Sequence, residues 1–289
     1  MAEPNPKAPM LPFGKGVEWF FMGLGLVRAQ PWRLLVLGLL LQLLAGLTQY
    51  SIFGLIFFLC LPAFSVGMLE AVRHVHAGGR PPVTALFAAF GHPDRLPRLL
   101  VLGTLMLIAV VFSVGFAMAG AVANLDPLLL QRLESGDPNA VMELDPAILT
   151  RTLYGMVIGM FLGAGITYFG APLIFFRGNG LGQALVDGLV ALIRQWKPLL
   201  VMGLLLGLLS IPPAILTVLT ASHVALGESP PWFLSLPTMA VVVVFQVLVF
   251  ATQYASYVEV FGVPGGSGGT RPEDGDDAEA EDRDDQLVA

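Results

Sequence analysis

Polar side chains inside long apolar stretches are the residues of this sequence best suited to chemistry. Gln246, Gln253 and Tyr257 recur at i, i+7 and i+11, which places them on one face of a helix. Gln42 belongs to another apolar stretch, at a depth that we expect to match that of Gln246. Because an amide facing lipid has no hydrogen-bond partner, these groups must face other helices. They predict a hydrogen-bonded clasp between helices, or alternatively the lining of a polar cavity.

Two adjacent prolines, Pro212 and Pro213, lie in the middle of a further apolar stretch. Each removes a helical hydrogen bond, which frees carbonyl groups near Leu208 and Leu209. Interrupted helices of this kind bind substrates or ions in transporters. A kink that serves packing alone is the commoner outcome. The prolines and the glutamines together are therefore our candidate polar cavity.

Two acids, Glu70 and Glu259, fall within apolar stretches. Each comes near the end of its stretch, so we expect both at the membrane surface. Arg73, three residues after Glu70, is the expected ion-pair partner of that carboxylate. No acid is expected at mid-depth, which argues against proton-coupled transport.

Metal and catalytic sites have little support in the sequence. His74, His76 and His92 cluster in one loop, but no further ligand follows at a recognisable spacing. The single cysteine, Cys60, excludes an internal disulfide and a cysteine-based zinc site. No phosphate-binding loop or nucleophile motif is present. We expect no catalytic residue, metal or cofactor, and a protein that is not an enzyme.

Small residues recur every fourth position in one apolar stretch, which lets another helix approach closely. We expect this ridge to pack either inside the molecule, which we favour, or against another subunit. Its members are Gly155, Gly159, Gly163, Thr167 and Ala171.

The elements that hold these residues follow from composition. Of 289 residues, 55% are hydrophobic and 12% charged, which excludes an ordinary soluble enzyme. A membrane helix needs roughly 20 apolar residues to cross the hydrocarbon. The sequence predicts an all-α integral membrane protein with six spans, the first two joined by a tight hairpin at 48–51. The predicted spans are 33–49, 52–73, 99–123, 152–176, 199–221 and 238–261.

The distribution of basic residues predicts the orientation. With the N-terminus in the cytoplasm, 13 of the 15 Lys and Arg fall on the cytoplasmic side, and only Arg132 and Arg151 fall outside. Both termini are then cytoplasmic. The arginines of the first cytoplasmic loop would attract anionic lipid headgroups.

Aspartate–proline pairs predict helix starts in the longest outer loop. Asp126-Pro127 and Asp145-Pro146 each place a capping acceptor before a proline suited to a first helical turn. We predict a short helix over 127–134 and a helix beginning at 146.

A short motif occurs three times, each time at the start of a predicted span. Arg33–Gly38 and Arg98–Gly103 both read RLLVLG, and Pro198–Gly203 reads PLLVMG. The apolar segments before them, at 15–29, 82–90 and 181–196, are too short or too polar to span and predict helices in the membrane interface. The architecture would be three units, each an interfacial helix followed by a transmembrane hairpin.

Two sequence features carry a resemblance to a known group of proteins. The first span begins with Ala29-Gln30-Pro31-Trp32, and the first cytoplasmic loop is Gly- and Pro-rich, with Gly78-Gly79-Arg80-Pro81-Pro82. Over about residues 15–262 the chain resembles a family of uncharacterised bacterial inner-membrane proteins with six spans and cytoplasmic interfacial helices. The resemblance implies a location in the bacterial inner membrane and no established activity.

The chain divides into a flexible N-terminus (1–14), a membrane domain (15–262) and an acidic tail (263–289). Nine of the 21 acids lie in the last 17 residues, so we expect the tail to be disordered. A non-enzymatic scaffold or accessory component is the function we expect first, with a lipid bilayer, a second copy or another membrane protein as partner and no nucleic acid. A small-molecule transporter is the alternative.

Overall fold

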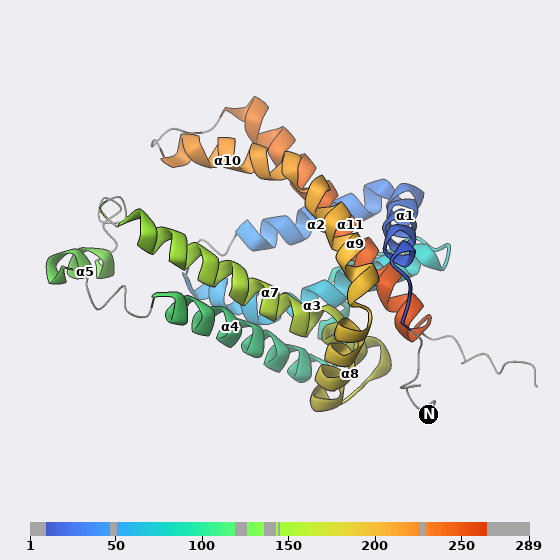
Figure 1. Ribbon diagram of the computed structural model, residues 1–289. Helices are drawn as coiled ribbons and strands as arrows, with labels where there is room; N and C mark the ends of the chain where they lie inside the picture. The colour runs from blue at the N-terminus through green and yellow to red at the C-terminus, as the bar shows by residue number, and fades with distance from the viewer. Residues whose placement is uncertain are drawn as a thin grey trace, which may run out of the picture.

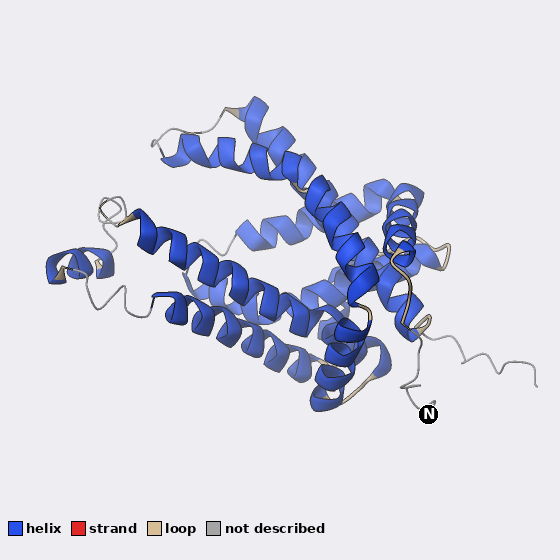
Figure 2. Cartoon of the chain, viewed as in Figure 1, coloured by secondary structure: helices blue, strands red, loops and turns tan. Residues whose placement is uncertain are grey.

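The structure, a computed structural model, describes residues 10–46, 51–118, 126–135, 143, 145–225, 229 and 231–264. This part of the chain consists of helices and connecting loops, without a strand (Figure 2). The predicted all-α class is therefore confirmed for it. The helices are α1 (Gly14–Ala29), α2 (Pro31–Gly46), α3 (Ser51–His76), the 3₁₀ helix η2 (Val83–Gly91), α4 (Leu96–Met118), α5 (Pro127–Glu134), α7 (Pro146–Arg177), α8 (Leu181–Arg194), α9 (Trp196–Leu209), α10 (Ile211–Ala225) and α11 (Trp232–Phe261).

Four helices, α3, α4, α7 and α11, are long and apolar enough to cross a membrane. Two further pairs pass the same test only when taken together: α1 with α2, which meet at 99°, and α8 with α9, which meet at 79°. Four to six spans are thus compatible with the described helices.

In chain order the helices form three hairpins that share a common base, and α3 of the first hairpin also lies beside α4 of the second (Figure 1). The first hairpin is α2–α3, the second is α4–α7, and the third is α9 and α10 with α11. We call this base the packed end. Each hairpin contributes the start of its first helix (α2, α4 or α9) and the end of its last helix (α3, α7 or α11). The helices α1, η2 and α8 pack there as well. The buried residues of all three core clusters gather there. The opposite halves of the hairpins expose apolar side chains.

Local capping explains where two helices begin. The Asp126 carboxylate accepts a hydrogen bond from the Leu128 amide at 2.9 Å, and α5 begins at Pro127. The Asp145 carboxylate accepts one from the Ala147 amide at 2.8 Å, and α7 begins at Pro146. Both helix starts predicted from the aspartate–proline pairs are therefore confirmed.

The predicted fifth span, 199–221, falls on two helices rather than one. The chain forms α9 and α10, separated at Ser210. The interruption expected from Pro212 and Pro213 is present: neither proline has an N–H to donate to the Leu208 or Leu209 carbonyl, and both lie in the first turn of α10. The break lies just before the prolines, and the Ala214 amide donates to the Ser210 carbonyl at 3.0 Å.

Each segment expected in the membrane interface forms a helix of its own, α1, η2 and α8 in turn. Close glycine contacts hold two of them on the core. The α1 backbone at Gly23 touches Thr252 of α11, and Gly188 of α8 lies against Gly170 of α7. Several predictions lie outside the described residues: the 48–51 hairpin, the end of span 99–123, residues 1–9 of the N-terminus and the tail from 265 onward.

Candidate functional site

One predicted polar residue, Gln253, forms a hydrogen bond between two helices. It is buried, and its Nε2 donates to the main-chain carbonyl of Tyr168 on α7 at 2.8 Å. In a regular helix that carbonyl would accept from the amide of residue 172, which is Pro172 and has no N–H. The glutamine therefore satisfies a carbonyl that the proline leaves without its helical donor.

The same position joins four helices at the packed end. The Tyr168 and Ser256 hydroxyls, on α7 and α11, are 2.8 Å apart. Beside them, Trp19 of α1 packs against Met202 of α9. Trp19 is only 2% exposed, and no acceptor among the described residues reaches its Nε1. This cluster, which we call the clasp, ties α1, α7, α9 and α11 together.

The other residues of the candidate polar cavity do not converge on the clasp. Tyr257 is buried between the rings of Phe176 and Phe261, with centroid distances of 5.5 Å and 5.4 Å. Gln42 on α2 is half-buried. Gln246 is also half-buried, and within the described chain its buried Oε1 has no hydrogen-bond donor.

The two prolines of the candidate cavity differ in burial: Pro213 is buried and Pro212 is exposed. They start α10 at the surface of the third hairpin. The structure thus distributes the predicted set over α2, α10 and two depths of α11.

The small-residue ridge of α7 faces α4. A Cβ atom added at Gly155 would lie 2.5 Å from Ala117 Cβ, and one at Gly159 would lie 2.7 Å from Val110 Cα. At Gly163 it would lie 2.5 Å from Met106 Cγ. Two further members lie toward the packed end: Thr167 donates to the Gly163 carbonyl at 3.0 Å, and Ala171 is fully buried. The ridge lets α4 and α7 lie side by side (Figure 1).

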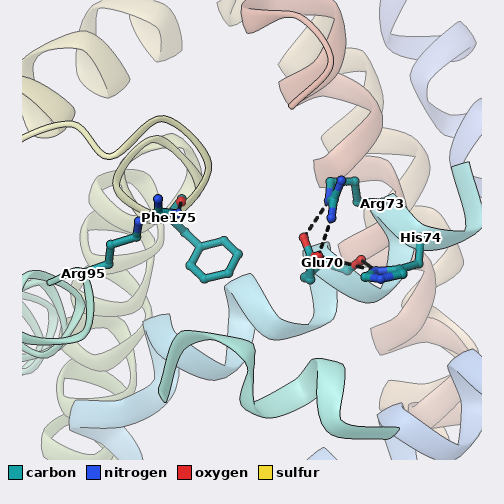
Figure 3. A network of polar contacts seen from close by, with 5 residues as sticks. All are labelled: Glu70, Arg73, His74, Arg95 and Phe175. Atoms are coloured by element: carbon teal, nitrogen blue, oxygen red, sulfur yellow. Dashed lines mark hydrogen bonds and ion pairs between the residues drawn. The ribbon is translucent and has the colours of Figure 1, made fainter. Parts of the chain in front are cut away.

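Glu70 is the centre of a polar network at the packed end. The side chains of Arg73 and His74 point toward Glu70, and Arg95 and Phe175 lie together to one side of this group (Figure 3). Arg73 donates two hydrogen bonds to the carboxylate, at 2.6 and 2.7 Å, and His74 Nδ1 lies 2.9 Å from the Glu70 carbonyl oxygen. Glu70 therefore has the expected partner and is not an isolated buried charge.

The second acid, Glu259, pairs with α1. Its Oε1 lies 3.2 Å from Lys15 Nζ, which also contacts Glu18 at 2.7 Å. The pKa of Lys15 is raised, first by its hydrogen bond to Glu18 and next by Glu259. Lys15 thus stays protonated at neutral pH and links α1 to the end of α11.

The three clustered histidines have separate protein contacts. Besides His74, His76 Nδ1 lies 3.1 Å from the Tyr254 hydroxyl, and the His92 ring packs edge-on against Phe175 at 5.4 Å. In the described chain no group of three His, Cys, Asp or Glu side chains is placed to hold a metal.

Four arginines at the packed end donate to main-chain carbonyls. Three of them surround the ends of α7 and α11. The pairs are Arg33 with Pro81, Arg95 with Phe175, Arg98 with Gly178 and Asn179, and Arg177 with Phe261. The last three pairs place positive charge at the C-terminal ends of α7 and α11, where carbonyls carry partial negative charge. The basic residues are recognisable in the sequence, but their carbonyl acceptors are not, because these contacts depend on the tertiary fold.

An open apolar groove of about 390 Å³ lies between α4, α7 and α8. Only apolar side chains line it: Leu105, Ile108, Ala109, Phe112, Ile166, Leu185 and Leu189. The sequence analysis did not predict this groove. The seven-residue spacing of Leu105 and Phe112 indicates a shared face, but only the fold brings α8 across it.

No protein-family model, no curated protein and no solved structure matches the chain.

Proposed function

We propose that the chain is a six-span protein of the bacterial inner membrane, built from three units of an interfacial helix and a transmembrane hairpin. The steep bends at the α1–α2 and α8–α9 junctions support interfacial positions for α1 and α8. The three hairpins correspond to the three units. Basic residues at the packed end support a cytoplasmic position for that end and for both termini.

Within that membrane, the role that we propose is a non-enzymatic scaffold or accessory component. One observation carries it: the helices pack tightly at one end, whereas the far halves of the hairpins present apolar faces that no described part of the chain covers. Such faces fit a helix of another membrane protein or of a second copy. The glutamine best placed for a cavity, Gln253, is instead committed to the clasp.

Photo-crosslinking in living cells tests the scaffold. A photoreactive residue replaces Phe116, which is 77% exposed on the far half of α4, and a matched control replaces Val186, which is 62% exposed on α8. We expect a protein adduct of discrete, reproducible mass from position 116 and none from position 186. Equal labelling at both positions, or adducts with lipid alone, would argue against a scaffold.

A transporter remains the second candidate because of two observations. The third hairpin contains a helix broken at Ser210, and Gln246 keeps a buried oxygen without a donor among the described residues. Cysteines placed at 246 and at 253 in a Cys60→Ala background test it with a small polar thiol reagent. Labelling of position 246 with protection of position 253 would support a solvated path beside α11. Protection of both positions would argue against transport.

A further inference from the structure

The groove between α4, α7 and α8 has the chemistry of hydrocarbon. Its lining carries no polar side chain among the described residues. The neighbouring face of α8 exposes further apolar residues, Val186, Val190 and Ile193. In a bilayer, the natural occupant of an open apolar groove is an acyl chain.

The position of Arg98 on α4 relates the groove to a headgroup. Arg98, Leu105 and Phe112 are spaced by seven residues, so they lie on nearly the same face, with a drift of about 20° per interval. At 1.5 Å per residue, Leu105 lies roughly 10 Å and Phe112 roughly 21 Å from Arg98 along the helix. One leaflet contributes about half of the ~30 Å hydrocarbon thickness. The groove thus begins within the leaflet on the side of Arg98, whereas its far end at Phe112 lies past the ~15 Å of hydrocarbon of that leaflet, so an acyl chain below Arg98 fills the part of the groove nearer to Leu105.

The charge beside the groove favours an anionic headgroup. Arg98 donates to the neutral carbonyls of Gly178 and Asn179, at 3.0 and 3.2 Å. In the described chain no carboxylate forms an ion pair with it, so the partial negative charge of these carbonyls at the end of α7 offsets its positive charge only in part. Arg95, three residues earlier, donates to the Phe175 carbonyl and contacts Asp94 at 3.5 Å. Arg98 is therefore the charge available to a phosphate at the end of the groove.

We propose that this site binds an anionic phospholipid, with an acyl chain in the groove and the phosphate at Arg98. Basic positions between membrane helices on the cytoplasmic side are suited to such headgroups. The binding site goes beyond the proposed scaffold, and its preference for an anionic headgroup rests on the proposed cytoplasmic position of the packed end. Absence of the crosslink at position 116 would contradict the scaffold but not the lipid site, and absence of lipid binding would contradict the lipid site but not the scaffold.

Native mass spectrometry of the full chain in detergent tests the headgroup. The probes are phosphatidylglycerol, phosphatidylethanolamine with the same acyl chains, and glycerol phosphate, which has no acyl chain. We expect the wild-type chain to prefer phosphatidylglycerol and to ignore glycerol phosphate. Arg98→Gln should weaken phosphatidylglycerol binding about fivefold, as loss of one interfacial cation predicts. Arg98→Lys should retain the preference, and Arg28→Gln, on an exposed arginine of α1, should not change it.

A second pair of variants tests the acyl chain. Leu189 and Val190 are adjacent on α8 and equally exposed, at 52% and 53%, but only Leu189 lines the groove. Leu189→Asn should weaken both phospholipids, whereas Val190→Asn should weaken neither. Because both side chains lie outside the core, we expect both variants to fold, so this pair tests the lipid site even if Arg98→Gln fails to fold. Equal binding of the two lipids by the wild-type chain, or matched behaviour of Leu189→Asn and Val190→Asn, would overturn the proposal, as would binding of glycerol phosphate alone.

Discussion

At the scale of single residues, Pro172 explains why an amide is needed at position 253. The proline leaves the Tyr168 carbonyl without its helical donor in the interior of a helix bundle, where water is scarce. Gln253 supplies that donor from α11, and the Tyr168 hydroxyl in turn contacts Ser256. The two contacts between α7 and α11 thus compensate for a helix defect and hold the second hairpin to the third.

Gln253→Leu should destabilise the folded state by about 1 kcal/mol, the usual scale for a hydrogen bond between membrane helices. In a Pro172→Ala background the alanine amide can serve the Tyr168 carbonyl, so the same substitution should cost measurably less. Unfolding by sodium dodecyl sulfate in mixed micelles, over the four-member double-mutant cycle, measures the difference. Equal costs in the two backgrounds would contradict the assigned role of Gln253.

At the scale of the elements, the glycine that ends each copy of the threefold motif has a different neighbourhood. A Cβ atom on Gly103 would overlap the Leu59 carbonyl of α3, and one on Gly38 would lie 2.6 Å from Val247 Cγ2. At Gly203 it would meet no atom within 4 Å. Equivalent positions in the sequence are therefore not equivalent in packing.

Alanine at these three positions should consequently give a graded loss of stability. Gly103→Ala meets a main-chain oxygen and should cost about 1–3 kcal/mol. Gly38→Ala meets methyl groups of buried valines rather than the main chain and should cost less, and Gly203→Ala should be close to neutral. Detergent unfolding of the three variants checks the order, with Gly115→Ala as the open-position control on α4. A large loss at Gly203 would show that the third copy packs differently.

Local rules were enough to predict several elements from the sequence. The starts of α5 and α7 followed from the aspartate–proline pairs, and α1, η2 and α8 followed from segments too short or too polar to span. The interruption at Ser210 followed from the two prolines, whereas the direction that α10 takes after it depends on packing against α11. The residues of the candidate cavity lie apart for a similar reason. Their spacing on a helix predicts how deep each one lies and which way it faces, whereas the partner of each residue depends on how whole helices pack.

At the scale of the whole molecule, contacts concentrated at one end predict uneven mobility. Regions with few buried contacts open at low free-energy cost, so the far halves of the hairpins should move relative to one another. Spin labels at Phe116 and Val218, on the far halves of α4 and α10, should give a broad distance distribution in a Cys60→Ala background. Labels at Val83 and Val186, at the packed end, should give a narrow one. Pulsed electron resonance in lipid nanodiscs measures both, and similar widths would contradict this division.

The contact of α1 with α11 also determines when, during synthesis of the chain, α1 can complete its packing. Gly23 touches Thr252, and Trp19 shares a cluster with Ala255, so the first helix completes its packing only when the last has been made. At 5–20 residues per second, the ribosome needs roughly 10 to 45 s to add the chain between these contacts. During that interval the side of α1 that packs on α11 stays uncovered. A helix able to rest at the membrane surface suits this delay, because it can await α11 without crossing the bilayer or leaving it.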